Sequence, residues 1–212
     1  MLETAAKTRE KEARQRGNIL GILASVFLRE PTVAFLEELL ASDFLKQMRG
    51  LGYVLFNEDQ PTPLEPLQED LWVEYARLFI GPGPHIHPYE SLQRGEARLW
   101  GEYTVEVKRF YERCGFALAE DSGIIPDHVG AELELLSRLA VAEADHWGKG
   151  QEELALNKRR LQTEFLSDHA TQWIPFFCDQ VAAAASHPFY AGFVSFTKDV
   201  LSSIVHELGS AS

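Results

Sequence analysis

The stretch EYARLFIGPGPHIHPYES, residues 74–91, is the most distinctive part of the chain, and the other segments are organised around it. It joins the end of an amphipathic helix to a loop rich in proline and glycine. Leu67, Leu71 and Leu78 follow at helical spacing, which places them on one face of that helix. Glu74 lies on the same face. We therefore expect its carboxylate to be buried and to have a partner.

The residues that follow form a stiff loop. The sequence GPGP at 81–84 ends the helix, because proline lacks the backbone donor and forces the preceding residue into an extended conformation. Pro88 keeps the chain extended up to Tyr89. We expect a functional loop over residues 80–95 that lies against the protein and presents side chains.

Helical spacing recurs along most of the chain and is strongest over residues 129–147. One apolar stripe there comprises Val129, Leu133, Leu136, Ala140, Ala144 and Trp147. No segment shows the sustained alternation typical of a half-buried strand, and no internal repeat is found. The sequence predicts an all-α protein, a single irregular helical bundle in one domain over residues 1–212. Residues 57–66 are predicted to be a linker, and residues 115–127 a hinge-like stretch.

Composition excludes several classes of function. The formal charge of −12 and pI near 5.0 argue against nucleic-acid binding, which needs a basic face, and favour a basic partner. Cys114 and Cys178 are far apart and form no metal or disulfide motif, so we expect two buried free thiols. The apolar run at 19–28 lacks a cleavage pattern and is too short for a membrane span. We expect a cytoplasmic protein without stable membrane insertion.

Polar residues before the strongest helix suggest a site. Asp127 is predicted to be the N-cap of that helix, and His128 and Glu132 lie one turn apart and can meet. With His85 and His87 of the loop they would supply metal ligands in principle. No recognised zinc spacing is present, however, and no nucleophile motif or phosphate-binding loop is found. We therefore expect no metal, no other cofactor and no catalytic residues.

The ordered motifs EYARLFIGPG, PYES, PDH and FLSDHATQW, the last followed by PFF, resemble the TorD/DmsD/NarJ family of cytoplasmic chaperones for molybdenum oxidoreductases. The resemblance covers residues 15–208. It implies an all-helical chaperone, monomeric or domain-swapped dimeric, that binds the twin-arginine signal peptide of a molybdopterin oxidoreductase catalytic subunit. It also implies that the apo subunit is held until cofactor insertion and export. The resemblance gives no role to His85 and His87.

Residue by residue, the resemblance places Asp127 and His128 at the peptide site and gives His169 and Trp173 a structural role. The predicted peptide-binding residues are Trp72, Glu74, Tyr75, Phe79, Pro88, Tyr89, Glu90, Ser91, Asp127, His128 and Glu132. The apolar part of the peptide is expected to supply affinity, and its arginines register and specificity. An alternative left open is a small metal- or nucleotide-dependent enzyme that uses Asp127, His128 and the loop histidines.

Overall fold

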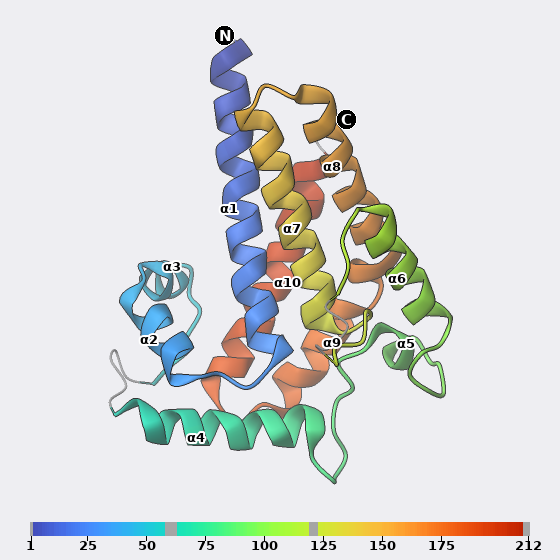
Figure 1. Ribbon diagram of the computed structural model, residues 1–212. Helices are drawn as coiled ribbons and strands as arrows, with labels where there is room; N and C mark the ends of the chain where they lie inside the picture. The colour runs from blue at the N-terminus through green and yellow to red at the C-terminus, as the bar shows by residue number, and fades with distance from the viewer. Residues whose placement is uncertain (1, 58–62, 119–122, 210–212) are drawn as a thin grey trace. The chain divides into compact units, whose positions relative to one another are not determined.

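The computed structural model describes residues 2–57, 63–118 and 123–209, so half of the predicted linker and the centre of the hinge-like stretch lie outside the described residues (Figure 1). Every regular element in the described ranges is helical, which confirms the all-α prediction. In chain order these elements are α1 (Leu2–Leu28), α2 (Val33–Ala41), α3 (Phe44–Gly50), α4 (Leu64–Tyr75), η1 (Ala76–Ile80), α5 (Glu90–Gln93), α6 (Glu102–Arg113), α7 (Val129–Gly148), α8 (Glu152–Phe165), η2 (Leu166–Ala170), α9 (Thr171–Ala184) and α10 (Pro188–Gly209).

The chain divides into two compact units. Unit 1 comprises Met1–Leu28, Tyr89–Ile174 and Leu201–Ser212, and unit 2 comprises Arg29–Pro88 and Pro175–Val200. The predicted functional loop, residues 80–95, is therefore shared between the two units. Its last part forms the single turn α5.

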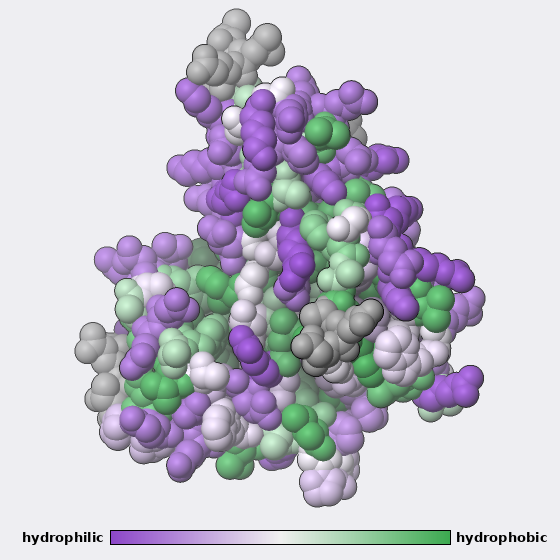
Figure 2. Space-filling view, in the orientation of Figure 1, coloured by the Kyte–Doolittle hydropathy of each residue, from purple (hydrophilic) through white to green (hydrophobic). Residues whose placement is uncertain are grey.

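Unit 1 is built on the lengthwise packing of α1 against α7, which lie side by side in Figure 1. Close approach depends on glycine: a Cβ added at Gly130 would lie 2.6 Å from Leu28 Cγ and 2.9 Å from Leu28 N. Near the middle of both helices, Ser137 Oγ donates to the carbonyl of Gly17 at 2.7 Å. Figure 2 shows hydrophilic side chains over the outer face of the N-terminal half of α1.

A buried charge joins four helices of unit 1. Arg16 of α1, 4% exposed, donates to Glu143 of α7 at 2.5 Å and to Gln162 of α8 at 2.9 Å. It also pairs with Glu207 of α10. A buried guanidinium without partners would destabilise the fold by several kcal/mol, so these contacts fix which helices meet and in what register.

Unit 2 has an aromatic core. Phe189 and Phe193 of α10 lie 4.8 Å apart between ring centroids, and Phe79 of η1 stacks on Phe177 of α9 at 5.9 Å. The Tyr190 hydroxyl donates to the carbonyl of Leu71 at 3.0 Å. Aromatic rings at these separations gain specific edge and offset contacts beyond area burial.

Helices end in wide turns at two places that the sequence did not predict. η1 and η2 are single π-helical segments after α4 and α8, and the first closes with Gly81 N donating to the carbonyl of Ala76 at 2.6 Å. π-Helical insertions are common next to functional sites. One of these segments carries residues of the candidate site described next.

Candidate functional site

Residues 89–91 of the PYES motif and the PDH motif lie together in unit 1. An isolated β-bridge joins Tyr89 to His128, whose rings meet edge to face at 5.2 Å. Glu90 N donates to the carbonyl of Asp127 at 2.9 Å, and Ser91 N donates to the Asp127 carboxylate at 3.0 Å. The structure therefore brings together five residues that the sequence predicted for the site.

The N-cap of α7 is His128, not Asp127 as predicted. His128 Nδ1 accepts from Gly130 N at 3.1 Å, so this nitrogen carries no proton. Burial lowers the pKa of His128 to about 4, so the ring is neutral near pH 7. Asp127 Oδ2 accepts from Ser91 N instead, and the adjacent imidazole serves as the cap. His128 and Glu132 lie one turn apart as predicted, but the Glu132 carboxyl accepts from Trp173 Nε1.

Three acidic side chains are fully buried beside this junction: Glu90, Asp127 and Glu132. Glu90 contacts His169 Nδ1 at 2.9 Å and Arg94 Nη1 at 2.7 Å. Such burial of several carboxyl groups is costly unless each is paired or protonated.

Glu132 is the protonated member of this group. Burial raises its pKa well above the ordinary glutamate value, and the neighbouring charge of Glu90 raises it further, although a 3.0 Å hydrogen bond from Trp173 Nε1 opposes this. The neutral carboxyl is able to donate to Glu90. Glu132 Oε1 and Asp127 Oδ1 meet no donor among the described residues.

The predicted residues of unit 2 form a separate group. Glu74 is 6% exposed, as expected for its helical face, and its carboxylate accepts from Arg77 at 2.8 Å and from the N–H groups of Ser186 and His187. Burial favours the neutral form of Glu74, but these hydrogen bonds outweigh it and lower the pKa. Glu74 therefore ties α4 and η1 to the turn between α9 and α10.

The other predicted residues of unit 2 are mostly buried. Tyr75 and Phe79 belong to the aromatic core, and Pro88 is buried where the loop ends. Trp72 is 45% exposed, and its Nε1 donates to the carbonyl of Pro31 at 2.8 Å. Trp72 is thus the member of this group with a large accessible apolar surface.

The loop histidines contact each other. His85 and His87 meet edge to face at 4.6 Å, and partial burial together with the charge of His85 lowers the pKa of His87. Across the described parts of the chain, no group of three or more His, Cys, Asp or Glu side chains has metal-binding geometry. Cys114 and Cys178 are free and buried, as predicted.

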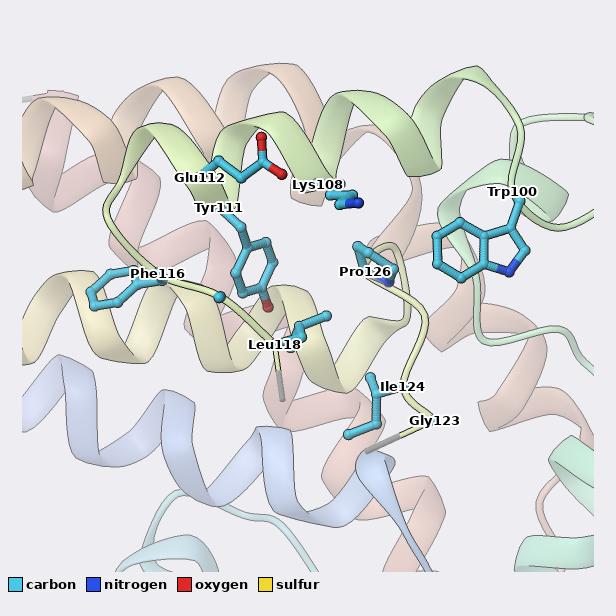
Figure 3. Close-up of a pocket in the computed structure, with 10 residues that line it drawn as sticks. Trp100, Lys108, Tyr111, Glu112, Phe116, Leu118, Gly123, Ile124 and Pro126 are labelled. Carbon is cyan, nitrogen blue, oxygen red and sulfur yellow. The ribbon is translucent and has the colours of Figure 1, made fainter. Parts of the chain in front are cut away.

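A pocket of about 510 Å³ lies beside the PDH motif in unit 1, and sequence reasoning missed it. We call it the α6 pocket. It is lined by Trp100, Lys108, Tyr111, Glu112, Phe116, Ala117, Leu118, Gly123, Ile124 and Pro126. Figure 3 shows Tyr111 pointing from α6 toward α7, with Phe116 on one side, Leu118 near the hydroxyl end of the ring, and Pro126 and Trp100 on the other side. Its walls are mainly apolar, with one lysine and one glutamate from α6.

Trp100 is unusual in the α6 pocket. Its φ of 63° lies in the left-handed region, which is unfavourable for a tryptophan, and the side chain is 59% exposed. Backbone strain of this kind is often kept where it places a functional side chain. The sequence feature that could have indicated this residue is a tryptophan within the polar segment between two helices.

The sequence profile described as "nitrate reductase delta subunit" matches residues 37–179. The chain belongs to this family. Its members are chaperones for molybdoenzyme maturation and not enzymes, so the enzyme alternative left open by the sequence is wrong. The family also confirms the resemblance to TorD and DmsD proteins that was inferred from the motifs.

Two curated chaperones that the chain is similar to agree with this family. The chain is 24% identical over 185 residues to a probable Tat proofreading chaperone, DmsD, of Haemophilus influenzae, with 83% of each chain covered. It is 22% identical over 148 residues to the chaperone protein TorD of Vibrio cholerae, with 66% of each covered. A candidate redox enzyme maturation protein of Archaeoglobus fulgidus, 24% identical, aligns in structure with a TM-score of 0.41 over 72% of this chain and 94% of its own.

No helix in residues 2–57, 63–118 and 123–209 is sufficiently long and apolar to cross a bilayer.

Proposed function

We propose that this chaperone binds the twin-arginine signal peptide of a molybdopterin oxidoreductase catalytic subunit. In this proposal it works in the cytoplasm and holds the apo subunit until the cofactor is inserted and the subunit is exported. Family membership supports the role, and the DmsD relative is itself described as a Tat proofreading chaperone. The net charge of −12 suits a basic leader.

The observation that carries the proposal is the α6 pocket. A twin-arginine leader has an apolar segment after its arginines, and a cavity of about 510 Å³ with aromatic and aliphatic walls is suited to its side chains. Pro126 belongs to the pocket wall, and the next two residues hold the 89–91 segment. We therefore place the apolar segment of the leader in this pocket.

The expected free energies indicate that apolar contacts supply most of the affinity for the leader. Micromolar binding corresponds to about −8 kcal/mol. Each leucine-sized side chain buried in the α6 pocket contributes roughly 1.5–3 kcal/mol before association costs, whereas an exposed arginine–carboxylate pair contributes about 0.2–1 kcal/mol. A leader with both arginines replaced by lysine should thus keep most of its affinity for the wild-type chaperone.

The buried residues predicted for the site have a supporting role in this proposal. Ser91, Asp127 and Glu132 are fully buried, so in this proposal they fix the two segments that border the pocket. Tyr89 is partly exposed and is able to touch a peptide at the border.

Calorimetric titration of the purified chaperone with a leader peptide tests the proposal. We expect micromolar or tighter binding, no binding of a scrambled peptide, and about tenfold weaker binding by Phe116→Ala because one aromatic wall of the α6 pocket is lost. Val105→Ala is the matched control, since Val105 is a 39% exposed residue of α6 outside the pocket lining. Absence of binding by several twin-arginine leaders would refute the proposed function.

A further inference from the structure

Arg94 occupies a site in unit 1 with the chemistry of an arginine receptor. We define the Arg94 site as the Glu90 carboxylate, the Asp168 carbonyl and the Tyr103 ring. Arg94 Nη1 lies 2.7 Å from Glu90 Oε1 and 3.2 Å from Asp168 O. Its guanidinium carbon is 4.0 Å from the centre of the Tyr103 ring. A carboxylate, a carbonyl and an aromatic face are the groups that recognise a planar guanidinium.

The surroundings of the Arg94 site favour a cation. Glu90 and Asp127 are fully buried, and the negative charges of both act on the neighbouring Glu132. Asp127 Oδ1 meets no donor among the described residues. The cluster therefore has acceptor capacity beyond what Arg94 and His169 satisfy.

A surface groove reaches this site. It has a volume of about 360 Å³ and is lined by α6 side chains, by Glu164 of α8, and by Asp168 and His169 of η2. Asp168 supplies the carbonyl of the Arg94 site, and His169 binds the other oxygen of Glu90. A side chain that enters along this groove, past Arg109 and Arg113 of α6, would come next to Asp168 and His169, which contact Arg94 and Glu90.

We propose that an arginine of the client leader takes this place and displaces Arg94, so that Arg94 is an internal competitor for the leader. This inference rests on the proposed function. The hydrogen bonds to Glu90 and Asp168 both use one nitrogen of Arg94, whereas a free guanidinium is able to approach the carboxylate with two. The Arg94 side chain is 26% exposed and precedes Gly95, whose φ of 92° ends the single turn α5. The side chain therefore has a route to solvent.

The displacement model predicts how selectivity changes. While Arg94 is present, an arginine of the leader must displace the Arg94 guanidinium, and this exchange gains little binding free energy. Leaders with arginine and leaders with lysine therefore differ little in affinity for the wild-type protein. Once Arg94 is removed, the site is open to a planar cation, and a lysine ammonium fits it less well. Removal of Arg94 should therefore strengthen binding of arginine leaders and create discrimination against lysine leaders.

Chemical rescue tests the site without any peptide. Arg94→Ala should lower the melting temperature, and millimolar methylguanidinium should restore it in a saturable way, because the small cation fills the place of the lost side chain. Methylammonium should restore much less. Arg138→Ala is the matched control, because Arg138 forms a comparable i,i+4 pair with Glu134 on the surface of α7. Equal responses of the two variants would overturn the inference.

Peptide titration tests the competition. We expect Arg94→Ala to bind a twin-arginine leader about tenfold more tightly than wild type, and a twin-lysine leader with less than half of that gain, given the strength of charge-assisted hydrogen bonds. If Arg94→Ala does not fold, Arg94→Lys should show a smaller gain in the same direction. Unchanged or weaker binding of the arginine leader would overturn the inference while the proposed function stands. Failure of the leader to bind wild type and every variant would overturn both.

Discussion

Replacement of Trp100 separates the role of its side chain from the strain of its backbone. Trp100→Gly and Trp100→Ala both remove the indole from the α6 pocket, but only glycine accepts a φ of 63° without penalty. A left-handed conformation costs a non-glycine residue about 1–2 kcal/mol, and the greater freedom of glycine in the unfolded chain offsets roughly 0.5–1 kcal/mol. Trp100→Gly should therefore be more stable than Trp100→Ala by about 0.5–1 kcal/mol.

The effect on binding follows from the exposed area. A tryptophan buries up to about 250 Å², so the 59% of Trp100 that is exposed corresponds to about 150 Å². If the leader covers half of this, the lost contact is worth about 2 kcal/mol at roughly 25 cal/mol per Å², or about a 30-fold weaker Kd. Both variants should show this loss equally.

Calorimetric titration with one leader peptide, together with urea unfolding, measures both quantities. Trp72→Ala is the informative comparison, because Trp72 is a 45% exposed tryptophan of unit 2 that the sequence predicted for the peptide site. If Trp100→Gly binds the leader as wild type does, the apolar segment does not enter the α6 pocket. A 30-fold loss in Trp72→Ala alone would place the contact in unit 2.

Three further predictions concern stability. Because the pKa of Glu132 is raised, the folded protein keeps a proton that the unfolded chain releases above about pH 4.3. The contribution of Glu132 to the free energy of unfolding is therefore full below that pH and falls as the pH rises. Glu132→Gln should therefore gain stability over wild type from about pH 5 to pH 8 in urea titrations, and a constant difference would contradict the assignment. The pKa of Glu74 is lowered, so its contribution to the free energy of unfolding is present above about pH 4.3 and is lost in acid. Glu74→Ala should therefore cost about 1–2 kcal/mol at pH 7 and less at pH 3. Glu69→Ala, which removes an exposed carboxylate, should not show this dependence on pH. Gly130→Ala should cost about 1–3 kcal/mol by calorimetry, because its Cβ would press on the backbone of Leu28, and an unchanged melting temperature would disprove that close packing.

The helices were predictable because apolar spacing reports which face is buried. The stripe from Val129 to Trp147 became α7, and the predicted burial of Glu74 was confirmed together with partners that follow it by more than 100 residues. Those partners were not predictable, since local periodicity carries no information about which distant backbone donors meet a carboxylate.

The candidate site was predictable in part. The motifs with Glu90 and Asp127 do lie together, but the N-cap was assigned to Asp127 because aspartate is a preferred cap, whereas a tertiary hydrogen bond to Ser91 occupies that carboxylate. The α6 pocket was missed because Phe116, Leu118 and Ile124 belong to a stretch without helical period. Apolar residues in irregular segments give no signal of the face to which they point.

The contacts of Arg16 have a consequence for synthesis of the protein. Its partners Glu143, Gln162 and Glu207 are made far later than Arg16 itself, so the guanidinium has none of them while the first half of the chain is emerging from the ribosome. Unit 1 also takes its segments from both ends of the chain and from its middle. Assembly of this unit must therefore await translation of α10, and a nascent chain stalled before Glu143 would expose a helix in which Arg16 has none of its acidic partners.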